Sequence, residues 1–262
     1  MKVRDKHVVV TGGASGIGRA LCQAFAREGA RSIIVADIDE SGAGAVAAEV
    51  GGHASLCDVS SEENIRHLIE TSEARFGPID LWCSNAGIAA GFQSDFVNAA
   101  AITNDVWHRA WSVNVMAHVY AARHLIPKMR ARGSGYFLKT ISAAGLLSQI
   151  GSAVYATTKH AAVGFAENLA LSHFDDGIRV SILCPQGVDT PQLRGLPRGP
   201  QSNDGVMSAS DVAGEAVRGI EAERFMILPH AEVHGYLQNK TDDIDRWIRG
   251  MARLQRQFRA AD

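Results

Sequence analysis

The chain has 262 residues, of which 46% are hydrophobic and 21% are charged. This length and composition indicate one large α/β domain with ample apolar residues for a core. The formal net charge is −2 and the basic residues are scattered, so we expect neither nucleic acid nor an anionic membrane as a partner.

The cysteines and the apolar runs bear on the cellular compartment. Cys22, Cys57, Cys83 and Cys184 form no CxxC pair, so we expect free thiols rather than disulfides or a metal site. The charged N-terminus leads directly into an apolar run, unlike a signal peptide, and no apolar stretch is long enough to span a bilayer. These features predict a cytoplasmic protein.

Short apolar runs rich in β-branched residues alternate with longer amphipathic stretches. The predicted strands are residues 7–11, 32–36, 53–57, 80–84, 135–141, 178–184 and 225–228. The predicted helices are residues 16–28, 40–50, 62–76, 105–132 and 152–174, followed by a helical C-terminal tail over 231–262. Almost wholly apolar strands separated by helices predict a seven-stranded parallel sheet with helices on both faces, in a single doubly wound, Rossmann-type domain. Residues 190–208, which contain several prolines and glycines, are expected to form a mobile lid.

The first predicted strand is followed by the glycine-rich turn TGGASGIG at residues 11–18. Glycines in this position permit a tight turn that presents backbone N–H groups, at a helix N-terminus, to a pyrophosphate. Asp37 follows the second strand, where a carboxylate can accept both hydroxyls of an adenosine ribose and repel a 2′-phosphate. The two features together predict NAD as the cofactor.

A second group of residues carries acid–base chemistry. Tyr155 and Lys159 lie four residues apart on one predicted helix, so their side chains share a face. A neighbouring ammonium favours the phenolate and would lower the pKa of the tyrosine. Ser142 ends the fifth strand, at the sheet edge where doubly wound folds bind ligands.

Taken together, these residues resemble the short-chain dehydrogenase/reductase family from residue 7 to about residue 190. The matching motifs are the turn at 11–18, Asp58-Val59, Asn85-Ala86-Gly87, Asn114, Ser142 and the pair Tyr155 and Lys159. The resemblance implies an NAD-dependent oxidoreductase that interconverts a secondary alcohol and a ketone.

The resemblance also implies residue roles. Tyr155 would exchange the proton with the substrate oxygen, Ser142 would stabilise the charge on that oxygen, and Lys159 would lower the pKa of Tyr155 and bind the nicotinamide ribose. Asn114 would hold a water that links Lys159 to solvent. The remaining cofactor contacts would come from Gly12, Ser15, Gly16, Ile17, Gly18, Asp37, Asp58, Val59, Asn85, Ala86, Gly87, Pro185, Gln186, Gly187, Val188 and Thr190.

Simpler interpretations remain open for several of these residues. Ser142 can be a strand-end hydroxyl, Asn114 can bridge a distortion of a helix, and Asn85 can serve the sheet more than the cofactor. Two other functions are also possible: a non-redox lyase that keeps a Ser–Tyr pair, or a nucleotide-sensing binding protein. The intact glycine turn argues against the first, and the complete set of four catalytic residues argues against the second.

The substrate is expected to be a hydrophobic small molecule. We predict that Ser142, Leu147, Gln149, Tyr155, Gln186 and Leu193 contact it. Gln186 departs from the Pro-Gly of the family pattern and stands in Pro185-Gln186-Gly187. Its amide either faces the substrate as a polar contact or points to the surface while Gly187 takes over the backbone role.

Three further features concern metals and assembly. His230 and His234 have metal-like spacing but no nearby third ligand, so we interpret them as surface histidines and expect no metal. The helix at 152–174 is apolar around much of its circumference, which predicts a homodimer or homotetramer. The tail carries an apolar stripe that must be covered, either by its own domain or by a neighbouring subunit.

Overall fold

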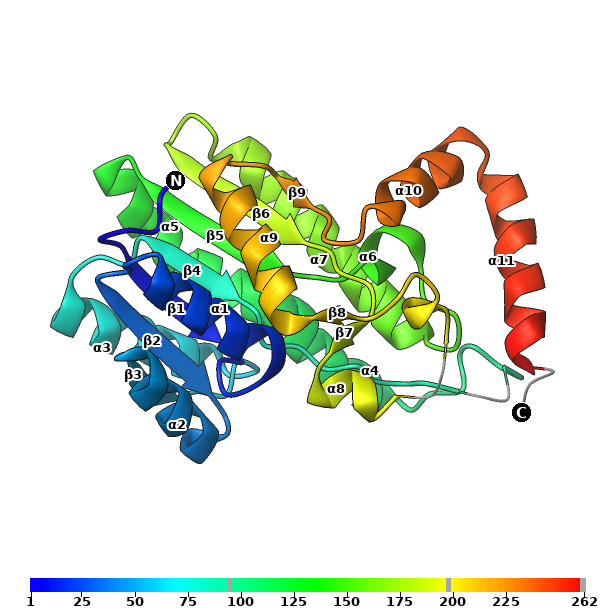
Figure 1. Ribbon diagram of the computed structural model, residues 1–262, viewed down its shortest axis with the longest axis horizontal. Helices are drawn as coiled ribbons and strands as arrows, with labels where there is room; N and C mark the ends of the chain where they lie inside the picture. Colours follow the sequence, from blue (N-terminus) through cyan, green and yellow to red (C-terminus); the bar gives the residue numbers. More distant parts are fainter. Residues whose placement is uncertain (94–95, 197–198, 260–262) are drawn as a thin grey trace.

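The computed structural model describes residues 1–93, 96–196 and 199–259. Its central element is a sheet of seven parallel strands in the order β3-β2-β1-β4-β5-β6-β9 (Figure 1). The strands are β1 His7–Thr11, β2 Ser32–Asp37, β3 His53–Leu56, β4 Leu81–Ser84, β5 Gly135–Thr140, β6 Ile178–Leu183 and β9 Met226–Ile227. The order reverses beside β1, so the carboxyl ends of β1 and β4 bound the switch point where such folds bind ligands. The predicted Rossmann-type single domain is confirmed.

Helices cover both faces of the sheet, and each layer has its own apolar core. On one face lie α1 Gly16–Arg27, α2 Glu40–Val50 and α9 Ala209–Glu221, which pack on side chains such as Val8 and Val10 of β1. On the other lie α3 Glu62–Phe76, α5 Ala117–Arg132 and α7 Ala153–Ser172, which pack on side chains such as Val9 and Phe137. Successive residues of β1 therefore face opposite layers, which is why this strand is apolar throughout.

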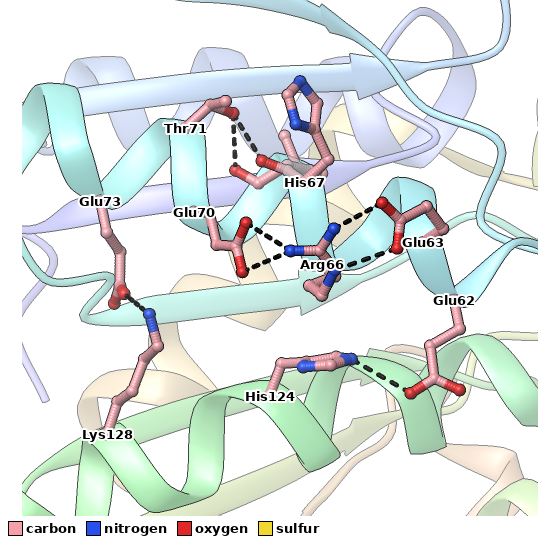
Figure 2. Close-up of polar contacts among 10 residues, drawn as sticks. Glu62, Glu63, Arg66, His67, Glu70, Thr71, Glu73, His124 and Lys128 are labelled. Atoms are coloured by element: carbon pink, nitrogen blue, oxygen red, sulfur yellow. Dashed lines mark hydrogen bonds and ion pairs between the residues drawn. The ribbon is translucent and has the colours of Figure 1, made fainter.

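Ion pairs join α3 and α5 along their solvent side, as Figure 2 shows. Glu62 accepts a hydrogen bond from Arg123 and contacts His124, and Lys128 lies 2.6 Å from Glu73. Such pairs are partly exposed, so each contributes little stability and together they orient the two helices.

The structure corrects the predicted helix over 105–132. This segment is α4 Asn104–Trp111, a π-helical stretch η1 Ser112–Met116, and α5. A π-helical turn accommodates an extra residue within an otherwise continuous helix, and it is often found at functional sites. The predicted helix therefore exists but is interrupted at Asn114.

The region after β6 contains more regular structure than the sequence analysis assigned. It holds β7 Val188–Asp189, α8 Pro191–Arg194, the 3-10 turn η2 Pro200–Ser202 and β8 Met207–Ser208, of which β7 and β8 pair in parallel. α9 was not predicted, although Val212, Ala213, Ala216, Val217 and Ile220 are buried at helical spacing. The predicted tail comprises two helices, α10 Glu232–Asp242 and α11 Ile244–Arg259.

Two expectations about the chain as a whole can be compared with the described residues. All four cysteines are buried and free. Within the ranges described, no helix combines the length and apolar character needed to cross a membrane.

Candidate active site

A cavity of about 720 Å³ opens at the carboxyl edge of the sheet. It brings together all but three of the residues predicted to form the site: Gly12, Ser15, Gly16, Ile17, Asp37, Asp58, Val59, Asn85, Ala86, Gly87, Ser142, Leu147, Gln149, Tyr155, Lys159, Pro185, Gln186, Val188, Thr190 and Leu193. The three predicted residues that do not line the cavity are Gly18, Asn114 and Gly187. Gly12 and Leu193, which are 181 positions apart in the chain, thus line one cavity because parallel strands end at the same edge.

The glycine turn lies at one end of this cavity and is too crowded for side chains. Gly12 has a φ of +66°, and a Cβ there would lie 2.8 Å from the Cα of Ala86. A Cβ on Gly18 would lie 2.0 Å from the carbonyl oxygen of Gly12. Ser15, which precedes α1, makes no side-chain capping bond, so the first N–H groups of α1 are left for another acceptor. The turn therefore fits an anionic group such as a pyrophosphate.

The Asp37 carboxylate is fixed at the end of β2 by two backbone donors. Its Oδ2 accepts from the N–H of Ala14 at 3.0 Å, and its Oδ1 accepts from the N–H of Asp39 at 3.0 Å. Each oxygen keeps a lone pair for a further donor. The lining residues that follow β2 and β3 are Asp37, Ile38, Cys57, Asp58, Val59 and Ser60, and none of these is a cation.

Asn85 connects β4 to the glycine turn. Its side-chain nitrogen donates to the carbonyl oxygens of Thr11 and Gly12 at 3.1 and 3.2 Å, while its own N–H donates to the hydroxyl of Thr11. Its contacts are therefore to the main chain that shapes the cofactor end of the cavity. Asn85 also lines the cavity, so its contact with a cofactor stays a prediction.

The first turn of α7 positions Tyr155. The Ser152 hydroxyl accepts from the N–H of Tyr155 at 3.0 Å and donates to the carbonyl oxygen of Ala90 at 2.7 Å, so one buried side chain caps the helix and ties it to the loop after β4. The Tyr155 ring lies 6.3 Å from that of Phe92, between ring centroids.

Lys159 lies one turn further along α7. Its Nζ lies 5.6 Å from the centroid of the Tyr155 ring and donates to the carbonyl oxygen of Thr140 at 3.4 Å. Burial lowers the pKa of Lys159 to about 8, because the charged ammonium loses hydration.

The pKa of Tyr155 is shifted by its burial. Burial raises it above its ordinary value, and the neighbouring Ser142 side chain opposes this shift only in part. The net shift is therefore upward, and the lowering of this pKa by Lys159 stays a prediction. Desolvation of the phenolate is the largest cause of this upward shift.

Ser142 follows β5 in an unusual backbone conformation. Its φ of 153° lies in a region that L-residues rarely adopt. Its hydroxyl accepts from the N–H of Ala144 at 3.1 Å and donates to the carbonyl oxygen of Pro185 at 3.4 Å, a long bond that a better acceptor could replace. Strained residues of this kind cluster at functional sites.

Asn114 is fully buried in the π-helical stretch. Its side chain accepts from the N–H of Ile88 at 2.9 Å, donates to the carbonyl oxygen of Ile88 at 3.0 Å, and donates to the Thr158 hydroxyl at 3.2 Å. The side chain thus clamps the loop after β4 to α7. The π-helical turn explains how a residue in the middle of a helix reaches that loop.

The residues after β6 account for the departure at Gln186. A Cβ on Gly187 would lie 2.6 Å from the carbonyl oxygen of Gln201, so the glycine is needed there for close approach. The N–H of Gln186 donates to Nδ1 of His230 at 3.2 Å, and the Oε1 of Gln186 is buried without a protein partner. The amide oxygen of Gln186 is therefore enclosed by the protein and does not lie in bulk solvent.

His230 was interpreted as a surface residue, and this is wrong. His230 is 4% exposed, and its Nδ1 accepts the hydrogen bond from the backbone N–H of Gln186. His234 is exposed, as expected. No group of three or more histidine, cysteine or acidic side chains suited to a metal ion occurs in the parts of the chain described.

The other end of the cavity is apolar and includes residues that the sequence analysis did not assign to the site. These are Trp247, Met251 and Leu254, which lie beside the expected Phe92, Leu147, Leu193 and Leu196. The apolar spacing of Trp247, Met251 and Leu254 was visible in the sequence as a stripe to be covered. Its place at the cavity depends on tertiary structure.

A Rossmann-type sheet with a glycine-rich turn, an acidic residue after β2, and serine, tyrosine and lysine at one cavity defines a dinucleotide-binding oxidoreductase. Residues 6–200 match the short chain dehydrogenase family. The chain therefore belongs to the short-chain dehydrogenase/reductase family and is an oxidoreductase.

Known proteins similar to this chain include dehydrogenases that act on hydroxyl groups. It is 34% identical over 256 residues to 1-deoxy-11-beta-hydroxypentalenate dehydrogenase of Streptomyces exfoliatus, covering 95% of this chain and 91% of that protein. It is 32% identical over 188 residues to 3beta-hydroxysteroid dehydrogenase 2 of Eggerthella lenta, covering 70% of each. A crystal structure of a short-chain dehydrogenase/reductase from Burkholderia phymatum in complex with NAD matches with a TM-score of 0.82 and 27% identity, covering 94% of this chain and 96% of that one.

Proposed function

We propose that this protein uses NAD to interconvert a secondary alcohol and a ketone on an apolar, ring-bearing small molecule. The observation that carries the proposal is the placement of Ser142, Tyr155 and Lys159 in one cavity with the glycine turn and Asp37. The glycine turn supplies a site for the cofactor, and the three side chains supply the acid–base chemistry beside it.

The residues present fit NAD rather than NADP. The N–H groups at the start of α1 would hold the pyrophosphate, and the fixed Asp37 carboxylate would accept the adenosine ribose hydroxyls. A 2′-phosphate would face this carboxylate in a part of the lining that holds no cation. When bound, NAD supplies the acceptor for the hydride that leaves the carbinol carbon.

Within the reaction, we assign proton transfer to Tyr155. Its phenol oxygen would take the proton of the alcohol during oxidation and return it during reduction, while the Ser142 hydroxyl would stabilise the charge on the substrate oxygen. Lys159 can exchange a proton near neutral pH, because its pKa is about 8. A proton passed to Lys159 could leave by a water held near Asn114.

The substrate class follows from the apolar end of the cavity. Phe92, Leu147 and Leu193 offer no charge to a polar substrate, while Gln149 offers a polar amide. The names of the two dehydrogenases above describe substrates in which a hydroxyl is carried on a fused ring system. A cyclic, apolar secondary alcohol suits both observations.

Absorbance at 340 nm tests the proposal, using NAD and a panel of cyclic secondary alcohols that includes a 3β-hydroxysteroid. Wild-type protein should form NADH, and Tyr155→Phe should lower kcat by 100-fold or more, the usual range for general acid–base catalysis. The affinity of the variant for NADH should be nearly unchanged, because the ring still packs. A variant that keeps more than about a tenth of the wild-type kcat would contradict the assignment.

A non-redox lyase or a nucleotide-sensing protein predicts a different result. Neither would produce NADH from any alcohol in the panel. The same measurement therefore separates the proposed function from both alternatives.

A further inference from the structure

The C-terminal helix α11 stands away from the body of the domain, beyond α6 Ala144–Leu147 and α7 (Figure 1). It is strongly two-faced. Its arginines at 246, 249, 253 and 256 are exposed, while Trp247, Met251 and Leu254 are half-buried at the helical spacing i, i+4, i+7. A helix of this kind needs a partner for its apolar side.

The chain itself fixes the position of α11. Lys240 near the end of α10 donates to the carbonyl oxygen of Leu146 in α6 at 2.6 Å, which anchors α10 to the domain. Asp243 then breaks the helical path in an extended conformation, and its carboxylate caps α11 by accepting from the N–H of Arg246 at 2.8 Å. The anchored α10 and this short break direct the apolar side of α11 toward the catalytic cavity.

Among the described residues, Trp247 packs against the edge of the apolar core, while Trp247, Met251 and Leu254 all stay partly exposed. Trp247, Met251 and Leu254 line the catalytic cavity together with Tyr155. A second cavity of about 960 Å³ adjoins it between α11 and the start of α7, and Trp247 and Met251 line both. Ile248, on the second cavity, is 57% exposed. The open space next to Tyr155 therefore continues along α11.

We propose that α11 is part of the substrate-binding site, and that Trp247, Met251 and Leu254 bind the apolar body of a bulky secondary alcohol whose hydroxyl reaches Tyr155. The inference rests on the proposed function and adds the residues that select substrate size. A second copy of the chain is a poorer occupant, because the stripe faces the catalytic cavity of its own chain and a partner helix would fill that cavity. A small alcohol would leave Trp247, Met251 and Leu254 exposed to water. Only a bulky alcohol would bury their apolar surface and so gain binding free energy from them.

The test compares two probes of different size. The bulky probe is a 3β-hydroxysteroid and the small probe is cyclohexanol, each with NAD. The double variant Met251→Ala and Leu254→Ala should raise the KM for the steroid at least tenfold, the scale expected for several lost apolar groups. Its kcat/KM for cyclohexanol should stay within about twofold of the wild type, and its NADH affinity should not change.

A matched control on the same helix separates binding from stability. The control carries Arg249→Ala and Arg253→Ala, which change only the exposed side of α11. It introduces two alanines, as the test variant does, so the two variants have a similar gain in helix propensity. This control should leave both substrates unaffected. Equal losses for the two probes, no loss for the steroid, or the same loss in the control would overturn the proposal.

A measurement of steroid binding without turnover tests the role of α11 separately from the proposed function. Calorimetric titration of the steroid into the NADH complex gives a dissociation constant without turnover. If the wild type binds the steroid and the double variant binds it at least tenfold more weakly, but neither oxidises it, the proposed function fails and the role of α11 stands. If the wild type neither oxidises nor binds the steroid, the role of α11 fails as well.

Discussion

At the residue scale, the choice of cofactor depends on Asp37. The wild type should prefer NAD over NADP by at least tenfold in kcat/KM, because a 2′-phosphate would lie against an unpaired carboxylate. Asp37→Ala should narrow this ratio, both by weakening NAD binding and by removing the repulsion. Since Asp37 also accepts from the N–H of Ala14, the variant can loosen the glycine turn, but this affects both cofactors and cancels in the ratio. Equal use of the two cofactors by the wild type would refute the assignment.

At the element scale, α7 depends on its N-terminal cap. Ser152 is 2% exposed and makes two hydrogen bonds, one to Tyr155 and one to Ala90. Ser152→Ala should therefore lower the free energy of unfolding by roughly 2 kcal/mol, the sum of a lost cap and a buried carbonyl left without its donor. Urea denaturation measures this loss. Ser152→Thr keeps the hydroxyl and should recover most of the free energy of unfolding. An equal loss in both variants would show that the size of the side chain, rather than its hydrogen bonds, determines the stability at this position.

At the scale of the whole molecule, a buried lysine makes stability depend on pH. Lys139 on β5 is fully buried, its Nζ has no hydrogen-bond partner, and it lies 5.0 Å from the centroid of the Phe165 ring. Burial lowers its pKa from 10.5 to about 7. Between these two values the unfolded chain binds more protons than the folded one, so the free energy of unfolding rises as pH rises from about 7 toward 10.5.

Lys139→Met should remove this dependence. At pH 7 and below the variant should be more stable than the wild type by on the order of a few kcal/mol, less the cation–π attraction that it loses. The difference should shrink toward pH 10. Thermal denaturation across this pH range measures both trends, and Lys2→Met, at an exposed lysine, should show neither. A wild-type advantage at every pH would mean that packing around Lys139 outweighs the desolvation of its charge.

The quaternary structure also belongs to this scale and remains a prediction. Leu171 at the end of α7 is 79% exposed and Phe174 is 60% exposed. These residues agree with the expectation that α7 meets a second subunit. Sedimentation equilibrium would distinguish a homodimer or homotetramer from a monomer.

The sequence alone determined the features that depend on local pattern. Short, almost wholly apolar runs predicted the seven strands, and amphipathic runs at a helical period predicted most helices. A strand buried on both faces needs the first pattern, and a helix buried on one face needs the second. The glycine turn, Asp37 and the pair Tyr155 and Lys159 were found in the same way, since their chemistry depends on short spacings. The helix α9 was missed although its buried positions follow the same rule.

Only the tertiary structure decided what depends on contacts between distant segments. The Asn114 side chain accepts a hydrogen bond from the backbone of Ile88, 26 positions away in the chain. The His230 ring accepts one from the backbone of Gln186, 44 positions away. The apolar stripe of α11 could be recognised in the sequence, but its position beside Tyr155 could not. Periodicity shows which face of a helix must be buried. The segment that packs against this face is decided by the tertiary arrangement of the whole chain.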